Sequence, residues 1–308
     1  METKHILAIL DPSLEKNPAA RRAITQARQS GARLTMAVFE DHQTIVESGL
    51  MGDALTRQAI DGWQSEVENW LDEVVSGLDS EGVSVDTKVV IGHPLADQIL
   101  ETIEAGDYDL VIKDSHDESF LSRAFFTPLD WHLLRRCPIP LMLAKADSGD
   151  SPKRIAAAVD PFHERGKPAE LDRRILATAK SLAELYGAEL HVIHACQTQP
   201  LGANSPLEGP SLEFEKVRDE ITRHHTRALH ELSEEFQISQ DRSHFLDAPA
   251  RRAIADFTRE QSVDLLVMGT VTRKGLTRLI MGSTAEAILG RLECDVLAIK
   301  PEGFPNKA

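Results

Sequence analysis

The stretch HILAILDP at residues 5–12 is a short apolar run that ends in Asp-Pro, and it returns as RIAAAVDP at residues 154–161. A second stretch, GARL at residues 31–34, returns as GAEL at residues 187–190. Apolar runs of this length, bounded by turn residues, are typical of buried strands. Their recurrence in the same order indicates that the chain is one kind of domain written twice.

The repeat continues to the end of the chain. Residues 94–99 match residues 249–254, and the closing stretch LMLAK at 141–145 matches VLAIK at 296–300. A length of 308 residues also suits two domains of about 150 residues each. We therefore expect one domain over residues 1–146 and a second over residues 147–308.

Short apolar strands alternate with helical stretches in each half, which is typical of a parallel sheet with crossover helices. The fold class predicted is α/β, with two tandem doubly wound domains of five parallel strands each. In the first half we expect strands at 5–10, 33–39, 85–91, 109–113 and 139–144, and helices near 15–30, 54–79, 95–105 and 127–136.

Composition narrows the class of protein. Lys and Arg number 34 against 49 Asp and Glu, a formal charge of −15, which argues against nucleic acid or anionic lipid as a partner. No apolar run approaches the ~18 residues that span a bilayer, so membrane insertion is not expected. The N-terminus lacks the basic start and apolar core of a signal peptide, which predicts a cytoplasmic protein. The three cysteines are too widely spaced for a metal or redox motif, and we expect buried free thiols.

The ends of the strands are where open parallel sheets bind ligands. In the second half the first strand ends at Asp160 and the fourth at Gly269, followed by a loop that leads to Gly282-Ser283-Thr284. Free N–H groups at a helix start there would bind an anion. The alternative is a capping box, because Ser283 and Glu286 have the spacing that satisfies a helix start without a ligand.

These features together resemble the universal stress protein family, and the duplication resembles its tandem-domain bacterial members. The resemblance rests on the strand ending in Asp, the Val-Met-Gly strand end, the Gly-Ser-Thr after the loop, and the closing CDVLAIK. The family's nucleotide-binding branch has Gly, two residues, Gly, nine residues, then Gly followed by Ser or Thr. Gly269, Gly282 and Ser283 match this pattern, whereas Thr272 stands where the family has its second glycine.

The resemblance implies a Rossmann-like, adenine nucleotide alpha hydrolase-like fold and a partial site for ATP with Mg²⁺ in the second domain. The residues it implies are Asp160, Ala195 and Met268 for the adenosine, and Gly269, Thr272, Gly282, Ser283 and Thr284 for the phosphates. It also implies that the last strands of the two halves pair, forming an internal pseudo-dimer. Further homodimerisation stays open.

The implied function is that of a cytosolic stress-response binding protein. The alternative is a module for another small ligand or a protein partner in which both ATP sites are degraded. Gly-x-Ser-x-Gly, Walker and His-Glu-x-x-His motifs are absent from the sequence, so no catalytic residue or metal site is predicted, although slow ATP hydrolysis stays open.

The first half lacks the glycines of this pattern. Aligning the halves places Asp114, Asp117, Thr127 and Pro128 opposite Gly269, Thr272, Gly282 and Ser283. The carboxylates would repel a phosphate, and Thr127-Pro128 is an ordinary helix start. A metal cluster over 114–118 is a weaker alternative.

The remaining candidate metal ligands in the second half are histidines. His191 and His194 lie three apart on a predicted strand, so they should point to opposite faces and share no metal. His224, His225 and His230 fall on a predicted helix without metal-binding spacing, and we expect them on its charged surface.

Overall fold

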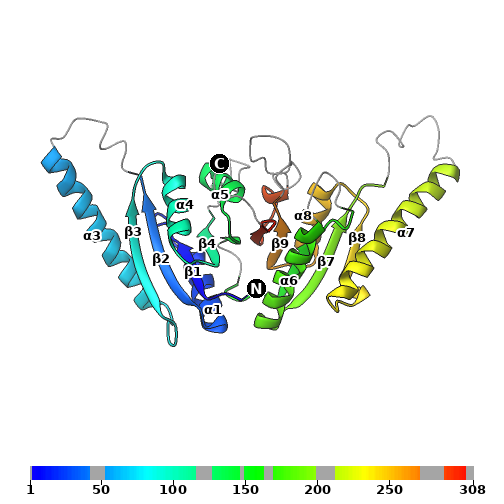
Figure 1. Ribbon diagram of the computed structural model, residues 1–308, viewed down its shortest axis with the longest axis horizontal. Helices are drawn as coiled ribbons and strands as arrows, with labels where there is room; N and C mark the ends of the chain where they lie inside the picture. Colours follow the sequence, from blue (N-terminus) through cyan, green and yellow to red (C-terminus); the bar gives the residue numbers. More distant parts are fainter. Residues whose placement is uncertain are drawn as a thin grey trace. The chain divides into compact units, whose positions relative to one another are not determined.

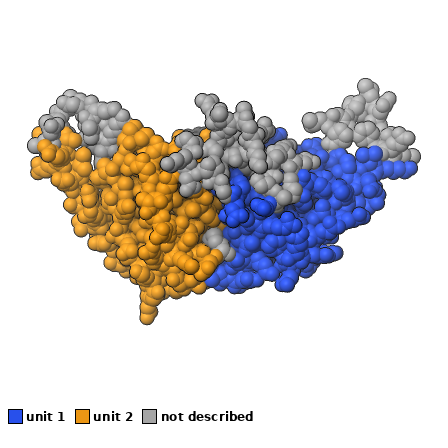
Figure 2. Space-filling model, viewed as in Figure 1, with its two compact units in different colours: residues 1, 152–294, 299–303 blue, residues 2–151, 295–298, 304–308 orange. Residues whose placement is uncertain are grey.

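The computed structural model describes residues 2–41, 53–115, 127–145, 149–162, 169–198, 212–270 and 288–302. The chain divides into two compact units, coloured separately in Figure 2. One unit contains residues 2–151 together with residues 295–298, and the other contains residues 152–294 and 299–303. A short piece of the last strand therefore belongs with the first half of the chain.

In the first unit the strands lie side by side in the order β3-β2-β1-β4-β5-β10, where β10 is the strand Asp295–Ile299 near the end of the chain. Figure 1 labels β1, β2, β3 and β4 of this sheet. Neighbouring strands pair in parallel except β5 and β10, which are antiparallel. Helix α1 packs against β1 and β4, and α3 against β3. The elements are β1 (His5–Ile9), α1 (Pro18–Ser30), β2 (Arg33–Glu40), α3 (Asp53–Gly77), β3 (Val85–Ile91), α4 (Leu95–Ala105), β4 (Leu110–Asp114), α5 (Pro128–Arg136) and β5 (Leu141–Ala144).

The second half repeats this order, with strands β8-β7-β6-β9 side by side and parallel. Helix α6 packs against β6 and β9, and α7 against β8. The elements are β6 (Arg154–Ala158), α6 (Ala169–Tyr186), β7 (Glu189–Ala195), α7 (Leu212–Glu235), η1 (Gln240–Arg242), β8 (Ser243–Leu246), α8 (Ala250–Glu260), β9 (Leu265–Gly269) and β10 (Asp295–Ile299).

The predicted doubly wound α/β fold is confirmed, because in each half the first strand pairs in parallel with both the second and the fourth. The strands β1, β4 and β5 are buried along their whole length, as expected of a sheet covered on both faces. Most of their residues are apolar, but β4 ends in the charged residues Lys113 and Asp114. The strands and helices expected in the first half lie within a few residues of those observed.

The hydrogen bonds repeat along with the sequence. The Asp109 carboxylate accepts the N–H groups of Lys4 and His5, and the Asp264 carboxylate accepts those of Lys153 and Arg154. These bonds hold the start of the first strand in each half. Two side chains of the same type therefore perform the same task in both halves.

A further pair of hydrogen bonds and a pair of glycines show which residues of the two halves are equivalent. The Ser115 N–H donates to the Ala144 carbonyl at 2.9 Å, and the Thr270 N–H donates to the Ile299 carbonyl at 3.1 Å. Helices α1 and α6 are both followed by a glycine with positive φ, 70° at Gly31 and 64° at Gly187, a position that favours glycine.

The last strands of the two halves pair as predicted. Leu141, Met142 and Leu143 of β5 lie opposite Ala298, Leu297 and Val296 of β10, in antiparallel register. All six residues are almost completely buried. The pairing gives β5 a neighbour on its outer side, which removes an exposed edge.

Two smaller expectations have different outcomes. The three cysteines form no disulfide. Cys137 and Cys294 are buried as predicted, but Cys196 is only half-buried because it lies just beyond the end of β7. Among the described helices, none combines the length and apolar character needed to cross a membrane.

Candidate functional site

The ends of three adjacent strands form the candidate site in the second half. Asp160 lies two residues beyond β6, Ala195 ends β7, and Met268 and Gly269 end β9. Because β6 pairs in parallel with both β7 and β9, these residues lie at one edge of the sheet. Asp160 and Ala195 are partly exposed, whereas Met268 is buried. Four of the eight predicted site residues are thus at neighbouring strand ends.

The other four predicted residues, Thr272, Gly282, Ser283 and Thr284, lie outside the described residues. The cations that follow Thr272 in the sequence, Arg273, Lys274 and Arg278, do so as well. The loop of the glycine pattern is described only at its start, where Thr270 is held to Ile299.

Gly269 is required by the packing of the helix behind it. A Cβ atom at this position would lie 2.8 Å from Leu171 Cδ2 and 3.1 Å from Ile175 Cδ1, both on α6. Leu171 and Ile175 are completely buried, so either side chain would have to shift within the core to make room for it. The close approach of α6 to β9 therefore explains why this strand ends in glycine.

Asp160 is fixed by its backbone. Its N–H donates to Oδ1 of Asp172, a buried residue in the first turn of α6, at 3.1 Å. The bond ties the loop after β6 to the helix that follows. It leaves the Asp160 carboxylate at the partly exposed end of the strand, where it can accept hydrogen bonds from a ligand.

In the first half, the position equivalent to Gly269 is occupied by a buried carboxylate, that of Asp114. Asp114 at the end of β4 accepts the N–H of Ala19 at the start of α1 at 2.8 Å, the N–H of Asp11 at 3.3 Å and the Asn17 amide at 3.4 Å. Burial raises the pKa of Asp114, and the hydrogen bonds from Ala19 and Asp11 act in the opposite direction. The carboxylate expected at this strand end is therefore present, and it accepts hydrogen bonds from the chain's own N–H groups.

A buried ion pair lies next to Asp114 in the first half. Lys113 Nζ lies 2.8 Å from Asp130 Oδ1 and donates to the Asp114 carbonyl at 2.8 Å, and both ionic side chains are almost completely buried. Asp130 and Thr127 form a reciprocal capping box at the start of α5, and Pro128 is the first residue of the helix. The predicted ordinary helix start is confirmed, and its carboxylate would repel a phosphate.

A buried histidine pair underlies the candidate site in the second half. His194 Nε2 and His225 Nδ1 are 2.8 Å apart, and His194 Nδ1 lies 3.1 Å from the Val159 carbonyl oxygen. The Phe162 ring covers His225 at a centroid distance of 4.2 Å. The predicted surface position is wrong for His225, which is 8% exposed because it faces the sheet, but correct for the exposed His224.

His191 points to the opposite face of β7, as predicted. Its Nδ1 lies 2.9 Å from Nε2 of His244 on β8, and Phe257 packs against both rings. Burial lowers the pKa of His191, and the pKa of His244 is lowered by burial and by the charge of His191. Both rings are thus held toward their neutral form.

Neither partner of the strand histidines was found from the sequence, because His225 and His244 come from other elements and no spacing links them to β7. The only sequence signal was the alternation along the strand. Within the described part of the chain there is no group of three His, Cys, Asp or Glu residues that could hold a metal. Residues 116–118 of the metal alternative lie outside that part.

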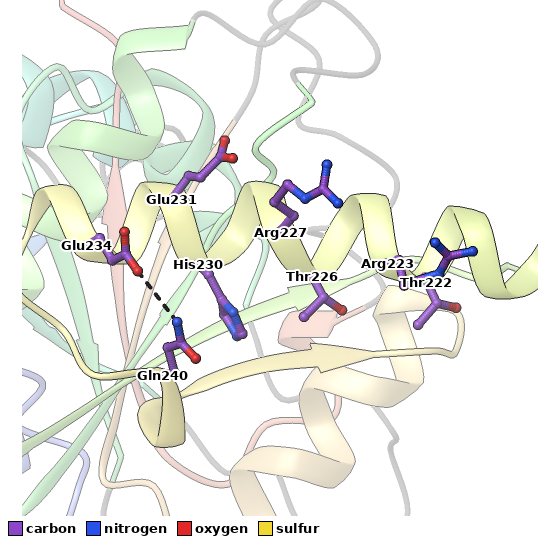
Figure 3. Close-up of a pocket in the computed structure, with 8 residues that line it drawn as sticks. All are labelled: Thr222, Arg223, Thr226, Arg227, His230, Glu231, Glu234 and Gln240. Carbon is purple, nitrogen blue, oxygen red and sulfur yellow. Dashed lines mark hydrogen bonds between the residues drawn. The ribbon is translucent and has the colours of Figure 1, made fainter.

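A separate cavity of about 400 Å³ lies between α7 and η1 (Figure 3). It is away from the strand ends, and its lining mixes both charges. Within this lining, the Gln240 side-chain amide donates a hydrogen bond to Glu234 at 3.5 Å. Its lining residues are Thr222, Arg223, Thr226, Arg227, His230, Glu231, Glu234 and Gln240.

Comparisons with known proteins agree with the repeat. The model of the universal stress protein family matches residues 2–145 and again residues 152–300. The chain is 29% identical over 310 residues to the universal stress protein E homolog of Haemophilus influenzae, covering 98% of each protein. It is 28% identical over 303 residues to universal stress protein E of Escherichia coli, covering 98% of this chain and 95% of that protein.

Solved structures give the same fold. A functionally unknown protein from Pseudomonas aeruginosa PAO1 superposes with a TM-score of 0.72 at 27% identity, covering 97% of this chain and 93% of that one. A universal stress protein from Archaeoglobus fulgidus superposes with a TM-score of 0.69 at 18% identity, covering 97% and 99% of the two chains.

Proposed function

Because the chain belongs to the universal stress protein family, we propose that it is a stress-response binding protein that holds one adenine nucleotide, ATP with Mg²⁺, at the strand ends of its second half. The first half would serve as a folded partner without a nucleotide. The proposed role is binding without turnover, in the cytoplasm, with neither nucleic acid nor membrane as a partner.

The contrast between the two fourth strands carries this proposal. In the first half β4 ends in Lys113 and Asp114, whose charges are bound to Asp130 and to the start of α1. In the second half β9 ends in Met268 and Gly269, which bring no charge to the strand end. An anionic ligand would thus meet buried carboxylates in the first half and none from these two positions in the second.

In this proposal, different residues contact the ribose, the adenine and the phosphates of the nucleotide. Asp160 would accept hydrogen bonds from the ribose hydroxyls, and Ala195 and Met268 would contact the adenine. The N–H groups from Gly269 and Thr272 through Gly282, Ser283 and Thr284 would bind the phosphates. Mg²⁺ would then be held mainly by phosphate oxygens and water, as is usual for this ion with nucleotides. Thr272 adds a branched side chain where the family has glycine, so we expect affinity below that of the complete pattern.

Calorimetric titration of the full chain with Mg-ATP tests the proposal. Wild type should bind with a Kd below about 1 mM, and Gly282→Val should weaken binding at least about tenfold, a loss of about 1.4 kcal/mol. Thr272→Gly should tighten it. Gly290→Val is the matched control, because no atom lies within 4 Å of a Cβ built at Gly290, and it should bind as wild type does.

Several outcomes would contradict the proposal. They are absent binding in wild type, or equal binding by wild type and Gly282→Val. Denaturing the purified protein and identifying what it releases then decides the alternative, since a compound other than a nucleotide would indicate a different small ligand. If wild type releases phosphate from ATP and Gly282→Val does not, the protein hydrolyses the nucleotide and the proposed binding without turnover is wrong.

A further inference from the structure

A buried ion pair joins the first helix of the chain to its last strand. Arg22 Nε on α1 lies 2.7 Å from Asp295 Oδ2 at the start of β10, and the two side chains are 4% and 6% exposed. Asp295 Oδ1 also accepts the N–H of Lys145, directly after β5, at 2.7 Å. Arg22 further contacts the Lys145 carbonyl and the Asp150 carboxylate, each at 3.4 Å. All four residues belong to the same compact unit.

The strands that meet here do not discriminate between partners by themselves. The paired residues are Leu141, Met142 and Leu143 on one side and Val296, Leu297 and Ala298 on the other. All are apolar, and antiparallel backbone bonds form equally well between any two such strands. A slip of two residues would also keep every side chain on its own face.

The ion pair, in contrast, exists for only one combination of helix and strand. By the correspondence of the halves, Thr178 on α6 is equivalent to Arg22, and Pro140 before β5 is equivalent to Asp295. A pairing of β5 with the β5 of a second copy would place Arg22 opposite Pro140, which offers no carboxylate. Arg22 would keep only its 3.4 Å contacts with Asp150 and the Lys145 carbonyl and lose its 2.7 Å carboxylate partner, and losing the close partner of a buried guanidinium is unfavourable.

We propose that the Arg22–Asp295 pair is the element that selects β10, in one register and in place of the β5 of a second copy, as the neighbour of β5. The covalent connection raises the local concentration of β10 but does not distinguish registers. Asp295 does so, because only the observed register lets it bind both Arg22 and the Lys145 N–H. The inference is independent of the nucleotide proposal.

The test replaces both charges together, because a single replacement would leave a buried charge and could unfold the chain. Arg22→Met with Asp295→Leu keeps the volume apolar, a change that buried ion pairs often tolerate. Arg22→Gln with Asp295→Asn removes the charges and keeps hydrogen bonding. The matched control is Arg173→Met with Glu235→Gln, which removes an exposed ion pair of 2.9 Å in the other unit.

Two copies of each variant, carrying different affinity tags, are expressed together and purified on one tag. For each double variant at 22 and 295, the amount of the second copy that co-purifies with the tagged copy should be at least about tenfold higher than for wild type. This excess should increase with protein concentration. The control should match wild type. If the folded variants at 22 and 295 also match wild type, the ion pair does not select the partner strand and the proposal is wrong; if only the Gln/Asn variant folds, its result alone decides.

Discussion

At the scale of single residues, the two halves differ in how the end of the fourth strand meets the helix behind it. In the first half the Asp114 side chain accepts the backbone N–H of Ala19 at the start of the helix. In the second half the strand residue is Gly269, and the helix supplies Leu171 and Ile175. Close packing requires that a change on one side be matched on the other. This difference explains how one fold accepts a charged strand end in one half and an uncharged one in the other.

Replacing Gly269 with alanine should therefore destabilise the protein even without a ligand. The added Cβ would lie 2.8 Å from Leu171 Cδ2, so α6 or its side chains must shift. Overpacking of this kind costs about 1–3 kcal/mol, which urea unfolding of the full chain would measure. Gly290→Ala has open space around its Cβ and should change the free energy of unfolding by less than about 0.5 kcal/mol. Equal effects of the two substitutions would show that α6 gives way freely.

At the scale of elements, the sequence predicted what local patterns encode. Buried strands appear as continuous apolar runs, so β1, β6 and β9 and the positions of Asp160 and Gly269 at strand ends followed from the pattern. The partners of His194 and Arg22 did not, because their contacts join residues 31 and 273 positions apart. No spacing rule links such residues; the sheet order brings them together.

The start of α5 shows how an element of the first half has changed. Lys113→Met should destabilise the chain by about 3–5 kcal/mol, because Asp130 would stay buried without its cation. Methionine is the residue at the equivalent position 268. Adding Asp130→Ala should recover most of that loss, apart from about 1 kcal/mol for the lost cap at Thr127. Denaturant unfolding of both variants measures this, and a double variant no more stable than Lys113→Met would show that the ion pair is not the cause.

At the scale of the whole molecule, duplication has left two copies with different chemistry. The framework bonds made by Asp109 and Asp264 are the same in both halves. The strand ends differ, and the charges at Lys113, Asp114 and Asp130 in the first half are all bound internally. Such differences leave the fold intact because they lie at the strand ends and not in the centre of the sheet.

This asymmetry predicts the stoichiometry of binding. Equilibrium dialysis of the full chain against labelled Mg-ATP should saturate at about one nucleotide per chain, although the family domain occurs twice. In the first half the Asp114 carboxylate holds the N–H groups of Ala19 and Asp11, and Asp130 holds the start of α5, so a phosphate would meet two buried carboxylates. Asp114→Gly should not add a second site, because Asp130 and Pro128 remain. Two nucleotides bound per wild-type chain would show that these internal charges do not close the first half.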